Sequence, residues 1–324
     1  MAAKTLFPDE KHPESLSVTP EKLESFQADK KIRLIDWILM AGVITTWGLT
    51  FVGIKETDHE APPLQAAGVR FMIAALVLMP LALQPAKLAK LKLADFGRFM
   101  IMGLIQTSLM FGIIYIAAPH VPGGVMAIIV NTNPFFVAIL AHLFIKGENL
   151  SRQKVWGLLL GFAGVLVLVF GGQGVGDVAF FWPLLLLGAS IFWATSSVLV
   201  KVFKFQDVLS ATAWQLFFGS IPLLITGFGI TNDQPIHWNW NFIFWTFYTA
   251  VIASSFGWWA WYGLLKRYSA SRISVFLFLV PVCGVIASII LLGESLTLGM
   301  VLGGLLVVGG IIVVNIRLGR GFNR

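Results

Sequence analysis

The chain has 324 residues, of which 57% are hydrophobic and only 12% charged, and its mean hydropathy is +0.83. Soluble domains carry about 25% charged residues, so this composition excludes an ordinary soluble protein. The net charge of +7 does not indicate nucleic-acid binding, because the basic residues lie at the ends of apolar runs. A single cysteine, Cys283, excludes a disulfide framework and a thiolate metal cluster.

Ten apolar runs, each long enough to cross a bilayer as a helix, follow a polar N-terminal segment. Residues 1–33 lack the apolar core of a signal peptide, and we expect them to form a disordered cytoplasmic tail. Residues 318–324 are expected to form a short cytoplasmic C-terminal tail. The predicted spans lie near residues 34–54, 64–84, 96–117, 122–145, 154–171, 179–200, 208–230, 241–264, 270–292 and 298–316.

Lysine and arginine residues are distributed unevenly between the two sides of these spans. If the ten spans alternate in direction, almost all basic residues fall on one side, and only Lys55 and Arg70 remain on the other. Since loops rich in lysine and arginine stay in the cytoplasm, both termini are predicted to be cytoplasmic. We therefore expect a multi-pass protein of the cytoplasmic (inner) membrane.

The two halves of the sequence are copies of one unit. A shift of 146 residues matches Trp47 with Trp193, Lys55 with Lys201, Gly147 with Gly293, Glu148 with Glu294 and Gly157 with Gly303, and a shift of 147 matches Tyr115 with Tyr262 and Pro134 with Pro281.

Residues 34–171 and 179–317 thus form two predicted repeats of five spans each. Five is an odd number, so the second repeat must enter the membrane in the opposite direction. Inverted repeats recur in secondary transporters, which bind substrate near the midplane between the repeats. The sequence predicts an all-α integral membrane protein in which ten transmembrane helices form two inverted five-helix repeats around a central cavity.

Acidic residues are missing from the middle of every predicted span. Intramembrane carboxylates usually mark proton relays or cation sites, so this pattern argues against a drug-cation antiporter built on a mid-membrane glutamate. The sequence also lacks a phosphate-binding glycine loop and a nucleophile motif. We expect no enzyme activity, no catalytic residue, no metal and no cofactor.

Two stripes of hydroxyl and aromatic residues at helical spacing are candidates for the cavity wall. They are Thr107, Phe111 and Tyr115 in the third span and their partners Ser254, Trp258 and Tyr262 in the eighth. The alternative is that these residues pack helices together while the hydroxyls bond to their own helix.

Asn131 and Asn133 precede Pro134 in the fourth span. The proline lacks an N–H and frees a backbone carbonyl, so broken backbone and amides together are candidates to bind a polar ligand. The two asparagines cannot face one cavity if the helix stays regular, because they lie about 200° apart. Their repeat partners are Phe278 and Val280, which makes the amides an asymmetric addition. The alternative role is an interhelical hydrogen bond.

Lys55 and Arg70 are placed near the outer mouth, where either could attract a substrate carboxylate. Arg70 could instead extend to the interface or pair with Glu56 or Asp58. For Lys55 we expect local pairing, because acidic residues surround it in the outer loops.

The remaining candidates for a gating or structural role are the repeated prolines and glutamates, Pro134, Glu148, Pro281 and Glu294. Both glutamates are expected to bond to nearby helix ends. Glycines at residues 157, 161 and 164, and again at 299, 303 and 310, predict that the fifth and tenth spans approach closely.

The chain resembles the bacterial EamA-type ten-helix exporters of the drug/metabolite transporter superfamily over about residues 36–315. The matching pieces are Trp47-Gly48-Leu49-Thr50-Phe51 with Lys55, Arg70-Phe71, Leu279-Val280-Pro281, Gly293-Glu294, and Gly303 to Gly310 with Asn315. The resemblance implies a basket in which spans one, three, four, six, eight and nine form the cavity wall and spans two, five, seven and ten face lipid. Members export amino acids, their derivatives and other small metabolites. Asn131-Thr132-Asn133 departs from the apolar residues common at that place.

The expected function is a secondary transporter that exports a small polar or zwitterionic metabolite, an amino acid or a derivative, by alternating access. The partners expected are the substrate, the lipid bilayer and a coupled gradient, of protons or of substrate, and the protein is expected to be a monomer. The predicted substrate-binding residues are Trp47, Thr107, Tyr115, Asn131, Asn133, Trp193, Ser254, Trp258 and Tyr262.

Two alternatives remain open from the sequence. One is an importer or exchanger of carboxylated or phosphorylated metabolites that uses Lys55, Arg70 and Lys201. The other is a membrane sensor or assembly component without transport activity, which the polar N-terminal tail suggests.

Overall fold

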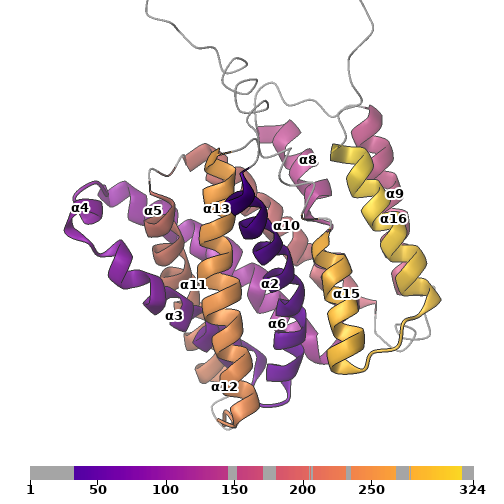
Figure 1. The fold of residues 1–324 in the computed structure, drawn as a ribbon, viewed down its shortest axis with the longest axis horizontal. Coiled ribbons are helices and arrows are strands. Elements are labelled where there is room, and N and C mark those ends of the chain that lie inside the picture. Colours follow the sequence, from indigo (N-terminus) through magenta and orange to yellow (C-terminus); the bar gives the residue numbers. More distant parts are fainter. Residues whose placement is uncertain are drawn as a thin grey trace, which may run out of the picture.

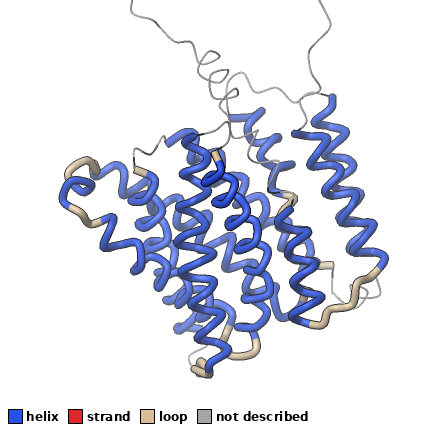
Figure 2. Tube along the Cα trace, viewed as in Figure 1, coloured by secondary structure: helices blue, strands red, loops and turns tan. Residues whose placement is uncertain are grey.

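The structure, a computed structural model, describes residues 33–144, 152–170, 180–203, 205, 207–230, 235–267, 277 and 279–315. Every regular element in these ranges is a helix, and no strand occurs among them (Figure 2). Residues 1–32 and 316–324, which include almost all of both predicted tails, lie outside the described part of the chain.

The helices follow the predicted spans in order (Figure 1). In the first repeat they are α2 (Leu34–Asp58), α3 (Pro63–Ala82), α4 (Pro85–Leu88), α5 (Leu93–Met102), η1 (Gly103–Met110), α6 (Phe111–Ala117), η2 (Ala118–His120), α7 (Gly123–Val130), α8 (Asn133–Phe144) and α9 (Arg152–Phe170). In the second they are α10 (Phe181–Phe203), α11 (Val208–Ile230), α12 (Trp240–Phe247), η3 (Tyr248–Phe256), α13 (Gly257–Arg267), α15 (Leu279–Leu292) and α16 (Leu298–Asn315).

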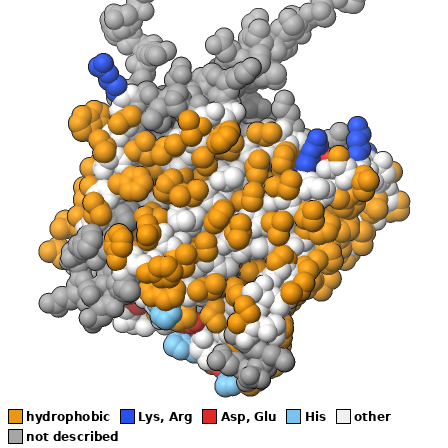
Figure 3. Space-filling model, turned by 180° about the vertical axis from the view of Figure 1, so that it is seen from behind, with side chains coloured by type: hydrophobic (Ala, Val, Ile, Leu, Met, Phe, Trp, Pro, Cys, Tyr) orange, Lys and Arg blue, Asp and Glu red, His pale blue; other side chains and the backbone are white. Residues whose placement is uncertain are grey.

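Several of these helices are long and apolar enough to cross a bilayer by length and composition alone. They are Leu34–Asp58, Pro63–Ala82, Leu93–His120, Phe181–Val200 and Val208–Ile230, and shorter apolar helices cover Gly123–Val137, Val155–Gly164, Leu279–Leu292 and Leu298–Gly310. Hydrophobic side chains cover the face shown in Figure 3, with lysine and arginine side chains gathered at one end and histidines at the other. An apolar surface of this extent matches a protein that is solvated by lipid.

Glycines set the distance between α9 and α16, which lie together at one edge of the bundle (Figure 1). A Cβ atom added at Gly164 would lie 2.7 Å from the carbonyl oxygen of Gly303, and one at Gly310 would lie 2.6 Å from that of Gly157. Backbone therefore meets backbone, as small residues allow in membranes. This confirms the predicted close approach of the fifth and tenth spans.

The repeat-related pair α3 and α11 packs in the same manner. A Cβ added at Gly227 would lie 2.7 Å from the backbone nitrogen of Gln65. Each of these two helix pairs joins a helix of the first repeat to one of the second, so the repeats are held together on both sides of the central helices.

Two irregular segments lie where the repeats correspond. The third span contains the π-helix η1 and the eighth contains the π-helix η3, and a shift of 147 residues brings the two into near register. π segments within α-helices occur frequently at functional sites. The fourth span is broken as well, because α7 ends at Val130 and α8 begins at Asn133.

Candidate functional site

A cavity of about 30 Å³ lies among the central helices. Its wall consists of Trp47, Thr50, Phe51, Ile54, Arg70, Met110, Phe111, Ile114, Val130, Asn131, Trp193, Ala253, Trp258 and Val280. One water needs roughly 10–15 Å³ of such space, so the cavity is no larger than about two waters. The surrounding helices must move apart before it can hold a metabolite.

Both repeats contribute to this wall. Apart from Arg70, the residues come from α2, η1, α6 and the end of α7 in the first repeat and from α10, η3, α13 and α15 in the second. These are the spans that the family resemblance implied as walls. The second span, α3, was expected to face lipid, yet it contributes Arg70.

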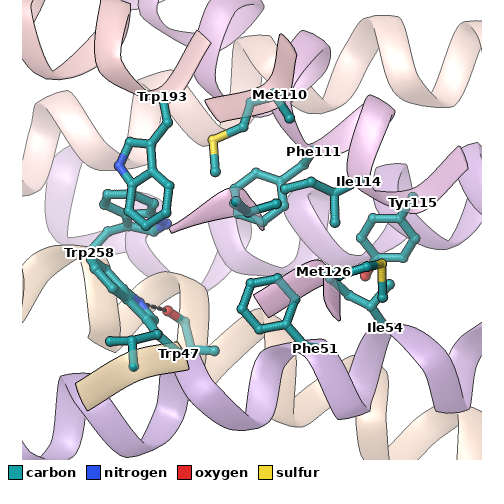
Figure 4. Close-up of a cluster of buried hydrophobic side chains, with 14 of the residues drawn as sticks. Trp47, Phe51, Ile54, Met110, Phe111, Ile114, Tyr115, Met126, Trp193 and Trp258 are labelled. Atoms are coloured by element: carbon teal, nitrogen blue, oxygen red, sulfur yellow. Dashed lines mark hydrogen bonds between the residues drawn. The ribbon is translucent and has the colours of Figure 1, made fainter. Parts of the chain in front are cut away.

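Three tryptophans form one side of the cavity (Figure 4). The ring centroids of Trp47 and Trp258 are 4.7 Å apart, and the ring of Trp193 lies 6.0 Å from Trp47 and 6.3 Å from Trp258. The indole nitrogen of Trp47 donates to the carbonyl oxygen of Ala253 at 3.1 Å, which holds α2 against η3. The cluster offers a rigid aromatic surface to the apolar part of a ligand.

Arg70 lies in this cavity and not at the outer mouth, where the sequence placed it. It is 2% exposed. Its Nε and Nη2 donate to the hydroxyl of Ser254 at 3.2 and 3.0 Å, and its Nη1 donates to the hydroxyl of Tyr115 at 3.4 Å. The alternative of pairing with Glu56 or Asp58 is not seen among the described ion pairs. Neutral hydroxyls on neighbouring helices hold the side chain inside the bundle instead.

Lys55, by contrast, stays at the end of α2. Its Nζ lies 3.8 Å from a carboxylate oxygen of Asp58 and donates to the carbonyl oxygen of Ala118 at 2.6 Å. The expected local pairing is confirmed. Glu56 is occupied elsewhere, since its carboxylate accepts a hydrogen bond from the side chain of Asn241 at 2.9 Å.

Of the two asparagines, only Asn131 lines the cavity. Its Nδ2 donates to the carbonyl oxygen of Ala127 in the same helix at 2.7 Å. No described residue donates to its Oδ1, which leaves that oxygen as the acceptor a ligand could use. Asn133 is 8% exposed and is not part of the wall. It lies at the start of α8, beyond the break in the fourth span.

Pro134 breaks the fourth span, as expected, but the carbonyl that it frees is not open to a ligand. The missing N–H of Pro134 would have bonded to the carbonyl of Val130. The hydroxyl of Ser190 in α10 donates to that carbonyl at 2.9 Å and also lies 3.0 Å from the hydroxyl of Thr132. A serine of the second repeat thus replaces the helical hydrogen bond that Pro134 removes.

The first hydroxyl and aromatic stripe is split by its π-helix. Phe111 lines the cavity and Tyr115 bonds to Arg70, but Thr107 is absent from the wall. Thr107 packs against Gly219 of α11. The wider turn of η1 changes the angle between successive side chains, so Thr107 leaves the face that an α-helix would give it.

The second stripe reaches from the cavity into a buried polar region. Trp258 lines the cavity and the hydroxyl of Ser254 accepts from Arg70. The hydroxyl of Tyr262 donates to the side-chain oxygen of Gln106 at 3.3 Å. The side-chain nitrogens of Gln106 and Gln215 are buried without a described partner, which marks this region as a place for a water or a ligand oxygen.

Glu294 caps the beginning of α7. Its carboxylate accepts from the backbone nitrogens of Gly123 at 2.6 Å and Gly124 at 3.1 Å. Gly293 has a φ of +66°, the left-handed conformation that favours glycine, and so turns the chain for this contact. The expectation that Glu294 bonds to a helix end is confirmed. Pro281 lies buried in the first turn of α15, whereas Glu148 lies outside the described residues, as do Phe278 and the side chain of Lys201.

Sequence reasoning missed most of the α2 wall. Thr50, Phe51 and Ile54 follow Trp47 at three, four and seven residues. That spacing puts them on one helix face, so extending the face from Trp47 would have identified them. The π-helices left no comparable signal in the sequence.

Comparisons with known proteins agree with this architecture. The sequence pattern of the EamA-like transporter family matches residues 35–170 and 180–316. The chain is 33% identical over 282 residues to an uncharacterised transporter of Bacillus subtilis, covering 86% of this chain and 91% of that protein. It is 29% identical over 288 residues to a probable amino-acid metabolite efflux pump of Escherichia coli, covering 86% and 94%. A solved crystal structure with 16% identity matches 87% of this chain and 96% of its own with a TM-score of 0.62, which shows the shared fold.

Proposed function

The chain belongs to the EamA-like transporter family, and on that basis we propose that it exports a small polar or zwitterionic metabolite, an amino acid or a derivative. The cavity enclosed between the two repeats carries this proposal, because its wall draws on both repeats. A site at such an interface can open to either side when the repeats move relative to each other.

Contacts between the repeats at both ends of the bundle support alternating access. At the end where α2 begins, Asp36 pairs with Arg267 of α13. At the other end, Glu56 accepts a hydrogen bond from Asn241 of α12, and the backbone nitrogen of His237 donates to the carbonyl oxygen of Glu60 at 2.8 Å. Opening either end would require these polar contacts to break.

The substrate class rests on the chemistry of the wall and on relatives. Trp47, Trp193 and Trp258 provide apolar surface, while Arg70 and Asn131 provide a donor and an acceptor. Two relatives, from Escherichia coli and Salmonella typhimurium, are described as probable amino-acid metabolite efflux pumps. An amino acid or derivative combines a polar head with a body that such a wall can contact.

Orientation, coupling and assembly are part of the same proposal. The excess of lysine and arginine on one side supports cytoplasmic termini in the cytoplasmic (inner) membrane. We assign the driving force to a proton or substrate gradient. Because both repeats of one chain supply the cavity wall, a monomer is sufficient for transport.

The direct test is a metabolite panel. Cells that overproduce the protein should retain less of one amino acid or derivative and tolerate more of it, and purified protein in proteoliposomes should exchange the same compound. A Trp258→Ala variant, which should bind the substrate roughly 30-fold more weakly, serves as the control.

Exchange of organic phosphates without exchange of any amino acid derivative would favour the alternative of a phosphate-ester exchanger. If the purified protein exchanged none of the compounds in the panel in proteoliposomes, transport itself would be contradicted.

A further inference from the structure

Arg70 is a buried cation that has no counter-charge among the described residues. Arginine stays protonated in proteins, and this one is 2% exposed within a membrane-spanning helix. Its hydrogen-bond acceptors among the described residues, the hydroxyls of Ser254 and Tyr115, are both neutral. Charged side chains inside the membrane are costly, and they usually pair or mark a substrate pathway.

The carboxylates nearest in sequence are engaged elsewhere. Glu60 lies 3.9 Å from the imidazole of His237. Asp58 pairs with Lys55, and Glu56 bonds to Asn241. Among the described residues, no ion pair includes Arg70, and no acidic side chain lines the cavity. The cavity therefore holds one positive charge that this part of the protein does not neutralise.

Helix packing does not require a charged side chain at the position of Arg70. The rings of Phe71 and Phe111 lie 4.8 and 5.1 Å from its central carbon, and these contacts offset a part of the cost of burial. The corresponding position in the second repeat is Leu216 or Phe217, by a shift of 146 or 147 residues. An apolar side chain thus suits the same place in the repeat, so the charge is an addition to the shared frame.

We propose that Arg70 binds the carboxylate of the transported substrate, and that the substrate is a small carboxylate whose apolar body lies on the tryptophan cluster. This inference rests on the proposed transport and names its substrate class. Arginine presents its donors in a planar fork that fits a carboxylate. Arg70, Trp47 and Trp258 line one cavity, so a single small molecule can contact all three.

The composition of the wall decides between related ligands. A phosphate ester carries a second negative charge, and Arg70 is the only cation in the described wall, whereas Lys55 is paired with Asp58. A substrate amino group would find no carboxylate there, only neutral acceptors such as Asn131. We therefore expect the carboxylate to be required and the amino group to contribute little.

The experiment compares five matched probes on the full chain purified in detergent. They are phenylpropionate, phenylalanine, phenylpropionamide, phenylalaninamide and phenyl phosphate. Binding is measured by the shift in thermal unfolding across a concentration series. We expect the two carboxylates to bind about 10- to 100-fold more tightly than their amides, as the loss of a charge-assisted contact implies. Phenylpropionate and phenylalanine should differ by only a few-fold.

Variants then assign the preference to one residue. Arg70→Gln should remove the preference for carboxylates, Arg70→Lys should retain part of it, and Lys55→Gln, the matched control at the end of α2, should keep it. The comparison of probes on the unaltered chain stands even if Arg70→Gln does not fold.

Three results would overturn the inference. They are equal binding of carboxylates and amides, a preference that survives in a folded Arg70→Gln variant, and stronger Arg70-dependent binding of phenyl phosphate. Failure of transport is distinguishable from these results. Carboxylate binding without exchange in proteoliposomes would refute the proposed function alone, and exchange of amides as fast as carboxylates would refute the Arg70 assignment alone.

Discussion

Two adjacent tryptophans in α13 allow contact with the ligand to be tested by single substitutions. Trp258 and Trp259 are neighbours in α13, but Trp258 is 4% exposed and lines the cavity, whereas Trp259 is 41% exposed on the outer surface. The same substitution at the two positions therefore tests the site with the same loss of volume.

We expect Trp258→Ala to weaken substrate affinity by about 2 kcal/mol, roughly 30-fold, and Trp259→Ala to leave it unchanged. The measurement is the concentration dependence of exchange in proteoliposomes. Equal effects of the two variants would show that the tryptophan cluster does not contact substrate.

Ser190 compensates for a backbone defect that Pro134 creates in the opposite repeat. Its hydroxyl takes the Val130 carbonyl that the proline leaves without a donor. Ser190→Ala should lower the stability by about 1–3 kcal/mol, since a buried acceptor is left unsatisfied.

The Pro134→Ala change should rescue that loss, because an alanine at this position would bring back an N–H for the carbonyl of Val130. Thermal unfolding of the two single variants and the double variant gives the coupling between the residues. Purely additive effects would show that the serine does not replace the missing helical hydrogen bond.

At the scale of helices, glycine contacts decide how closely the repeats pack. Gly309 and Gly310 are adjacent in α16, but an added Cβ at Gly310 meets the backbone of Gly157 and Gly161 at 2.6 Å, whereas one at Gly309 meets only the side chain of Leu160 at 3.6 Å. The first contact cannot yield without moving α9, and the second is an ordinary van der Waals distance.

Gly310→Ala should therefore destabilise the protein by about 1–3 kcal/mol through overpacking. Gly309→Ala should be neutral or stabilise slightly, because alanine favours a helix by roughly 0.5–1 kcal/mol over glycine. Unfolding midpoints in detergent measure both. A Gly310→Ala protein as stable as the parent would mean that α9 and α16 can separate freely.

In the whole molecule, two closely packed helix pairs join the repeats at the edges of the bundle. Between these pairs, polar contacts join the central helices of the two repeats at each end. The pairs α3–α11 and α9–α16 join the repeats through backbone contact, while Glu56 and Asn241 join them by a side-chain hydrogen bond at one end. Alternating access predicts that a covalent link at that end stops transport without unfolding the protein.

A Glu56→Cys and Asn241→Cys pair, made in a Cys283→Ser background, should lose most of its exchange activity on oxidation and regain it on reduction. Each single-cysteine variant, treated in the same way, is the control. Full exchange by the oxidised pair would contradict opening at this end.

The sequence alone determined the helical membrane fold, the two repeats and the family, because composition, span length and repeat spacing are local properties that one chain displays directly. It also located Trp47, Trp193, Trp258 and Asn131. The repeat and helical phase indicated the tryptophans, and the amide beside Pro134 indicated Asn131. The angular spacing of an α-helix does not apply within the π-helix η1, which contains Thr107. The sequence therefore placed Thr107 on the cavity face, whereas it packs against Gly219.

Only the tertiary structure decided where Arg70 lies and what holds it. Its acceptors Ser254 and Tyr115 are 184 and 45 residues away in sequence, and no local pattern specifies such partners. The same holds for Ser190, which meets the Val130 carbonyl from 60 residues away. Contacts between distant helices depend on how the two repeats dock, which is why the charge expected at the outer mouth is found in the cavity.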